Sequence, residues 1–188
     1  MPVSRQGSPL PHDLDLVVDF VNTRELDREP DRVTDELTTP ARLAAWLQER
    51  GLLRAGVGLA ASELDQALEL REALRGALLE HNEAGGSRAT GPLERVAEQG
   101  RLSVRFGDDG AVALQARAGG FAGALAQLLV PVARAGFDGT WERMKACAAD
   151  DCQWAFYDRS RNRAGRWCDM AVCGNRTKVR AYRSKRRA

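Results

Sequence analysis

Cysteine is scarce in this chain, and the first 146 residues contain none. All four cysteines lie in the 27 residues from Cys147 to Cys173. Ordinary buried thiols would rarely gather in so short a window, so the cluster indicates a dedicated site. Its spacing is considered below.

Long apolar runs are also missing. Crossing a bilayer takes about 20 consecutive apolar residues, whereas the run LAQLLVPVA is short and contains Pro131. We therefore expect a buried helix there and no membrane partner. The first twenty residues lack the basic region and uninterrupted apolar stretch of a signal peptide, so we expect a reducing cytoplasm.

Histidine occurs only at positions 12 and 81, and the usual catalytic motifs are absent. There is no Gly-rich phosphate loop, nucleophile motif or histidine-based metal pattern. An enzyme would need carboxylate chemistry without a recognisable motif, so we expect none. Asn22, Thr23 and Arg24 follow an apolar segment and could line a small-molecule pocket. The alternative is that they bond the local backbone.

Positive and negative residues are unevenly distributed along the chain, although the net charge is only +2. Residues 1–140 hold 15 basic and 21 acidic residues, whereas residues 141–188 hold 13 basic and 5 acidic ones. A basic end of this kind is typical of polyanion binding, nucleic acid first and a membrane surface second. Arginine supplies 25 of the 28 basic residues throughout, so the clustering is more informative than the residue type.

The first 140 residues predict a mainly helical domain of α+β class with one β-hairpin. Helices are expected over 40–50 (capped by Thr39), 62–84, 90–99 and 121–135, the last bent or stopped near Pro131. Residues 14–23 fit a helix or a strand, and the charged stretch 24–38 predicts a loop. Alternation over 101–106 and 112–116 around Gly-Asp-Asp-Gly predicts a hairpin with one buried face.

Charge and cysteine content change near Thr140, which suggests domains 1–140 and 141–188.

Spacing within the second domain indicates zinc. Four residues separate Cys147 from Cys152 and Cys168 from Cys173, and fifteen lie between the pairs. Two thiolates on each of two turns can complete one tetrahedral Zn²⁺ shell with no position open for water, as in a structural site. Two disulfides in a secreted protein are the competing interpretation.

The segment from Cys147 onward has 42 residues, too few to fold readily without help. Structural zinc supplies roughly 10–16 kcal/mol in comparable peptides. The aromatic residues Trp154, Phe156, Tyr157 and Trp167 form a core beside the metal or stack on bases. We favour the core.

A basic helix is expected after the fourth cysteine, with Arg176, Arg180, Arg183 and Arg187 on one stripe and Val179 and Tyr182 turned toward the finger. Such a helix fits a DNA groove; the alternative is a solvated tail. The basic loop between the two cysteine pairs is expected to contact the nucleic-acid backbone at a second place. The residues expected to contact nucleic acid are Arg159, Arg161, Arg163, Arg166, Arg176, Lys178, Arg180, Arg183 and Arg187.

The C-terminal segment closely resembles the CGNR zinc finger, on the elements F-x-D-x-S-R-N (156–162), R-W-C (166–168) and C-G-N-R (173–176). VDFVNT (18–23) and the helix around Trp46 are similar to the ABATE domain that usually precedes this finger. The resemblance implies a bacterial, stress-related transcriptional regulator, cytoplasmic and nucleoid-associated, whose finger binds duplex DNA. Its N-terminal domain would sense a small-molecule effector or pair subunits as a homodimer. RNA-binding and protein-binding fingers are the alternatives.

Overall fold

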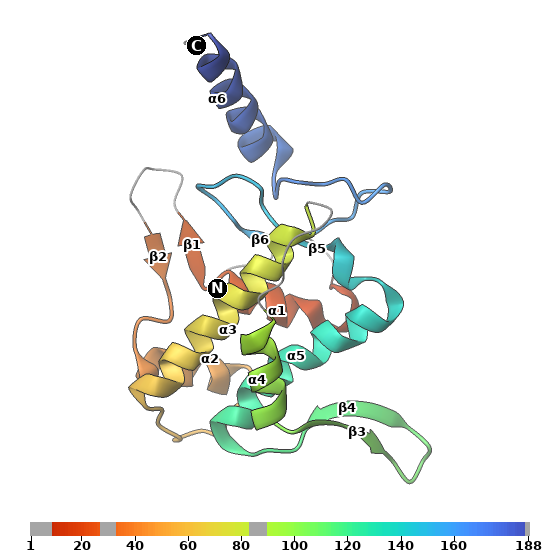
Figure 1. Ribbon diagram of the computed structural model, residues 1–188. Helices are drawn as coiled ribbons and strands as arrows, with labels where there is room; N and C mark the ends of the chain where they lie inside the picture. The colour runs from red at the N-terminus through yellow and green to blue at the C-terminus, as the bar shows by residue number, and fades with distance from the viewer. Residues whose placement is uncertain (1–8, 27–32, 83–89, 187–188) are drawn as a thin grey trace.

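The computed structural model describes residues 9–26, 33–82 and 90–186, and shows a helical body from which a hairpin and a terminal helix project (Figure 1). The body contains η1 (Pro11–Asp13), α1 (Leu14–Val21), β1 (Arg24–Leu26), β2 (Val33–Asp35), α2 (Pro40–Glu49), α3 (Ala61–Glu80), α4 (Gly91–Gln99), β3 (Leu102–Phe106), β4 (Val112–Ala116) and α5 (Gly120–Asp138). The last part contains η2 (Trp141–Arg143), β5 (Met144–Ala146), β6 (Ala155–Tyr157), η3 (Met170–Gly174) and α6 (Asn175–Lys185). The predicted α+β class, mainly helical with a small C-terminal finger, is confirmed.

The core lies where α1, α3 and α5 cross. Leu14, Phe20, Leu70, Leu74 and Leu128 are fully buried there. Burying each such side chain contributes roughly 2 kcal/mol to folding. The long helix α3 is therefore held by its apolar stripe, as its helical spacing predicts.

Helix α2 begins as its sequence predicts. The hydroxyl of Thr39 accepts a hydrogen bond from the backbone N–H of Arg42, and Pro40 occupies the first helical position. Trp46 on this helix packs against Phe20 of α1, with ring centroids 5.4 Å apart. The cap and the aromatic pair together fix α2 against α1.

Two expectations about the body are wrong. Residues 24–38 are more than a loop, because β1 and β2 pair as an antiparallel ribbon with Glu25 opposite Thr34. Three-residue strands rich in charge carry no alternating pattern, so the sequence offered no signal. Helix α5 also does not stop near Pro131 or end at Ala135, since it continues to Asp138 and ends at Gly139 with a positive φ of 73°.

The helix α5 is long and apolar enough to cross a membrane by length and composition alone. Ten of its nineteen residues are buried in the protein, among them Leu125 and Leu128. A helix in the core of a protein can be as apolar as a membrane-spanning one. Helix α5 is such a core helix, because its buried residues pack within the body (Figure 1).

The hairpin β5–β6 belongs to the last part of the chain but packs on the body. Met144, Ala146, Ala155 and Tyr157 lie in the same apolar cluster as the core of the body. Asn82 and His81, at the end of α3, bond the backbone oxygens of Ala146 and Met144. The division into residues 1–140 and 141–188 therefore stays a prediction.

Candidate metal centre and its basic surroundings

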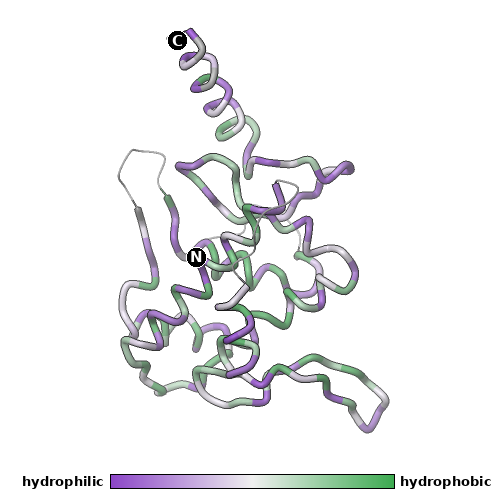
Figure 2. The backbone as a smooth tube through the Cα atoms, viewed as in Figure 1, coloured by the Kyte–Doolittle hydropathy of each residue, from purple (hydrophilic) through white to green (hydrophobic). Residues whose placement is uncertain are grey.

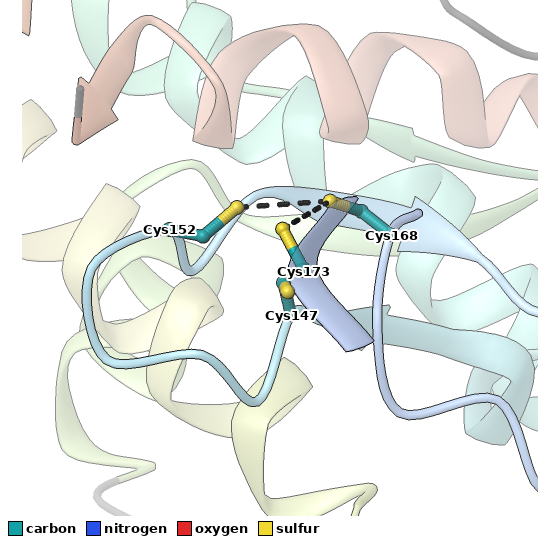
Figure 3. Close-up of side chains that lie close together, drawn as sticks. All are labelled: Cys147, Cys152, Cys168 and Cys173. Atoms are coloured by element: carbon teal, nitrogen blue, oxygen red, sulfur yellow. Dashed lines mark hydrogen bonds between the residues drawn. The ribbon is translucent and has the colours of Figure 1, made fainter. Parts of the chain in front are cut away.

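Four sulfur atoms converge from two turns of the C-terminal segment (Figure 3). Cys147 directly follows β5, and Cys152 lies in the turn that leads to β6. Cys168 precedes η3, and Cys173 lies inside it. All four sulfurs lie within 4.8 Å of one another, and Cys168 is 3.6 Å from Cys152 and 3.8 Å from Cys173.

These spacings match a tetrahedral zinc shell. With Zn–S bonds of about 2.3 Å, tetrahedral geometry places the sulfurs about 3.8 Å apart. A disulfide needs about 2.05 Å between sulfurs, and all four cysteines are free thiols. The four cysteines thus form a site for one zinc ion, and a closed sulfur shell makes it a structural one.

The four thiols perturb one another's pKa because they share protons. Hydrogen bonds from Cys152 and Cys168 lower the pKa of Cys147 to about 2. Hydrogen bonds with Cys147 have the opposite effect on its partners. They raise the pKa of Cys152 to about 12 and also raise the pKa of Cys168. One thiolate is therefore stable alone, whereas four need a divalent cation among them.

Local backbone structure positions the two turns. The N–H of Cys147 bonds the carbonyl of Trp154 at 2.9 Å, and Gln153 adopts a positive φ of 50° to close the turn. The carboxylate of Asp169 accepts the N–H of Val172 at 3.0 Å and starts η3. Of the four aromatic residues expected beside the metal, Trp154 and Trp167 pack against the cysteines, whereas Tyr157 lies in the core cluster of the body.

A buried ion pair between Lys145 and Asp158 fixes the basic loop 159–166. No pattern in the sequence predicts this role. Lys145 Nζ donates to Asp158 at 3.1 Å and to the carbonyl oxygens of Arg163 (2.6 Å) and Gly165 (2.9 Å). Asp158 also accepts the N–H groups of Ser160 and Gly165. Burial opposes its ionisation, but these hydrogen bonds outweigh burial and lower the pKa of Asp158 to about 2.

The loop presents its four arginines at the surface. Arg159 lies near the ring of Tyr157, 5.7 Å from its centroid. The exposed arginines of the loop are Arg159, Arg161, Arg163 and Arg166.

Helix α6 is tied to the zinc turn by a carboxylate. Asp151 accepts hydrogen bonds from Arg176 at 2.9 Å and Arg180 at 2.6 Å. Arg176 Nη2 also lies 3.8 Å from the sulfur of Cys173. Two arginines of the predicted stripe are thus already paired within the protein.

The rest of α6 is open. Lys178 and Arg183 are exposed, and Arg187 lies outside the described residues. Val179 and Tyr182 do not turn toward the finger as expected, since they are 47% and 61% exposed. The arginine stripe faces Asp151, so the opposite face of the helix points to solvent.

The three residues predicted to line a ligand pocket make structural contacts instead. Asn22 donates to the carbonyl of Ala155 at 3.0 Å and accepts its N–H at 2.8 Å. Thr23 bonds the carbonyl of Phe20, and Arg24 pairs with Glu72. Local and cross-chain bonding therefore accounts for their polarity, which leaves their role in a pocket a prediction without support.

Two buried arginines on α3 join the β1–β2 ribbon and the zinc turn. Arg71 binds Asp35 through two bonds of 2.8 and 2.7 Å. Arg75 donates to the carbonyl of Gln153, next to Cys152, and to that of Val21. Burial lowers the pKa of Arg75, and Glu72 opposes the change. Its five N–H donors suit it to several carbonyls at once.

A groove of about 760 Å³ lies elsewhere, between α1 and α2. Asp19, Glu36 and Trp46 line it, and Arg50 lies over the Trp46 ring at 3.9 Å. Burial raises the pKa of Asp19, against the charge of Arg50. A small-molecule effector stays a prediction.

Comparison with known families finds two matches. The model of the ABATE family, described as "Putative stress-induced transcription regulator", matches residues 14–138. The model of the CGNR zinc finger matches residues 143–186. No curated protein matches the chain.

We predict one zinc ion per chain, lost in the variant Cys168→Ser. Three thiolates and a hydroxyl bind zinc more weakly than four thiolates, so finger folding loses most of the metal's contribution. Elemental analysis and thermal melting would measure this. The melting temperature should fall while most helical circular dichroism remains, and Ala164→Ser should change neither. Full zinc in Cys168→Ser would contradict the four-sulfur site.

We predict that Asn22→Ala lowers the free energy of unfolding by about 2–4 kcal/mol, because it leaves the buried N–H and carbonyl of Ala155 unpaired. Urea denaturation would measure the change. Asn162→Ala removes an exposed amide and serves as control. An unchanged stability in Asn22→Ala would rule out the structural role.

We predict that Asp151→Ala loosens α6 without releasing zinc. Arg176 and Arg180 lose their shared carboxylate, so amide exchange over 175–185 should accelerate several-fold. Asp150→Ala, at the exposed neighbouring position, is the matched control. Equal exchange in both variants would show that Asp151 does not anchor the helix.

Proposed function

Because the chain belongs to the ABATE family and ends in a CGNR zinc finger, we propose that it is a zinc-dependent transcription regulator that binds duplex DNA. The observation that carries this proposal is the exposed arginine loop held between the two cysteine pairs. The family description names a regulator and no catalytic activity, so we propose no enzymatic function.

Basic residues outnumber acidic ones in the C-terminal part, where residues 141–188 hold 13 basic and 5 acidic residues. The nearby carboxylates are engaged, since Asp158 pairs with Lys145 and Asp151 pairs with Arg176 and Arg180. Guanidinium groups bind phosphate oxygens in bidentate geometry. The basic residues exposed on this surface are Arg159, Arg161, Arg163, Arg166, Lys178, Arg180, Arg183 and Arg186.

The shape of the C-terminal part supports binding to a duplex. Helix α6 projects from the body (Figure 1), and an α-helix fits the major groove of B-DNA. Its anchor at Asp151 sets the direction of the helix relative to the loop. We therefore assign the loop to phosphate contacts and the outer face of α6 to the groove.

Structured RNA is the closest alternative partner, because zinc-held basic modules also bind RNA. The major groove of A-form RNA is too deep and narrow to admit a helix such as α6. The projecting helix therefore favours duplex DNA over RNA as the partner. The family description supports a role in a response to stress. We further propose that the protein acts in a bacterial cytoplasm, on the nucleoid.

We predict that duplex DNA binds with a steep salt dependence and that Arg161→Ala/Arg163→Ala/Arg166→Ala flattens it. Each lost phosphate contact reduces the slope of log K against log salt by about 0.9, so three contacts reduce it by about 2.7. Fluorescence anisotropy between 50 and 200 mM salt would measure this.

The control for this experiment removes the same charge from the body. Arg54→Ala/Arg95→Ala/Arg134→Ala changes exposed arginines far along the chain from the finger, and its slope should match that of the wild type. Tighter binding to a hairpin RNA than to duplex DNA would assign the protein to RNA. Salt-sensitive binding to neither would point to a protein partner and overturn the proposal.

A further inference from the structure

Two projecting elements of the protein expose large apolar side chains to solvent (Figure 1). One is the β3–β4 hairpin, called the β3–β4 arm below, whose base packs on the core cluster. Its outer half exposes Val104, Phe106 and Val112, so the face that the sequence predicts to be buried is buried only at its base. The other element is α6, on which Val179 and Tyr182 are exposed.

Charge distinguishes these two elements. On the arm, the exposed Arg105 lies close in the chain to the exposed Asp108 and Asp109, so both signs occur together. Residues 175–186, which form α6 and its last turn, include no acidic residue. Figure 2 shows hydrophobic positions interspersed among the hydrophilic ones of this helix. An apolar and purely basic helix is complementary to an anionic partner that also offers apolar groups.

The two apolar side chains of α6 lie on one face. Residues three apart are neighbours on a helix surface, so Val179 and Tyr182 form an apolar pair. Successive residues are about 100° apart around the helix axis, which places Lys178 on one side of this pair and Arg183 on the other. Both flanking cations are exposed. The face is therefore an apolar strip with a cation along each edge.

Internal contacts of α6 leave this face open. Asp151 binds Arg176 and Arg180, which lie on a different side of the helix from the apolar pair. Arg186 lies one turn beyond Tyr182 and donates to its hydroxyl at 3.4 Å. The polar end of the Tyr182 ring thus has a partner within the helix, while the side chain stays 61% exposed.

The major groove of DNA offers one apolar group to such a strip. Base edges there present hydrogen-bond donors and acceptors, except for the C5-methyl group of thymine. The Val179 side chain has no polar atom, so it cannot read a donor or an acceptor, but it can cover a methyl group. The flanking cations suit the phosphates that border the groove on either side.

We propose that Val179 and Tyr182 contact thymine methyl groups, so that α6 prefers major grooves that carry a methyl group at C5 of the pyrimidine. The inference rests on the proposed binding of duplex DNA and adds the class of sequence that is preferred. RNA carries uracil, which lacks this methyl group, so the same contact favours DNA. Covering one methyl group changes affinity about fourfold.

Two duplexes that differ only in this methyl group test the proposal. The full chain with zinc is titrated by fluorescence anisotropy into alternating adenine–thymine DNA and into the same duplex with deoxyuridine in place of thymidine. Loss of the methyl groups should weaken binding roughly four- to sixteenfold, for one or two covered groups. The ratio should stay constant from 50 to 200 mM salt, because both duplexes carry the same phosphates.

A second pair of probes adds the methyl group instead of removing it. Alternating guanine–cytosine DNA is compared with the same duplex containing 5-methylcytosine, whose methyl group occupies the same C5 position. The methylated duplex should bind more tightly by a similar factor. This comparison needs no variant of the protein.

The variant Val179→Ser/Tyr182→Ser should lose the discrimination. It should bind the thymine and uracil duplexes equally and keep the salt dependence, because no charge is removed. Serine has about the same helix propensity as valine and tyrosine, so circular dichroism and zinc content should not change. Phe137→Ser removes an exposed phenylalanine at the end of α5 and is the matched control, which should discriminate like the wild type.

The outcomes separate this inference from the proposed function. Salt-sensitive binding of the wild type with equal affinity for both members of each probe pair overturns the methyl contact and leaves the DNA-binding proposal standing. Discrimination that persists in Val179→Ser/Tyr182→Ser also overturns it. Binding to none of the four duplexes overturns both proposals and assigns the apolar pair to a protein partner.

Discussion

Four thiol groups within 4.8 Å of one another are the constraint on which the C-terminal part of this protein depends. Ionising all four without a cation would place like charges in contact, and the opposite pKa shifts of Cys147 and Cys152 show that the cluster resists it. One zinc ion removes this repulsion and replaces the hydrophobic core that a segment of this length lacks. The arginine loop leads into the turn of Cys168 and α6 begins directly after the turn of Cys173, so both are attached to the metal turns.

The finger is also attached to the helical body through polar groups. Asn22 bonds both backbone groups of Ala155, and Arg75 reaches the carbonyl of Gln153, beside Cys152. These buried groups are costly unless paired, so they fix a single arrangement of finger on body. A change in α1 or α3 would therefore reach the zinc turn directly. This connection gives the body a physical route to influence the finger, and with it the proposed binding of nucleic acid.

Charge is arranged differently on the two projecting elements. On the finger, the carboxylates of Asp151 and Asp158 anchor α6 and the loop backbone, and the arginines of the loop are exposed. On the β3–β4 arm, Asp108 and Asp109 are exposed at the tip, with the exposed Arg105 on the adjoining strand. Excess positive charge is thus concentrated on the finger, whereas the arm carries both signs.

Local patterns in the sequence determined the zinc ligands, the Thr39 cap, the α3 stripe and the hairpin, because each depends on residues near one another in the chain. The tertiary structure alone decided the roles of Lys145, Asp151 and Asp158, which act through partners 13 to 29 residues away. It also decided that Asn22 bonds Ala155, which lies 133 residues further on. Hydrogen bonds and ion pairs between distant segments leave no periodicity in a sequence, whereas turns, caps and metal ligands do.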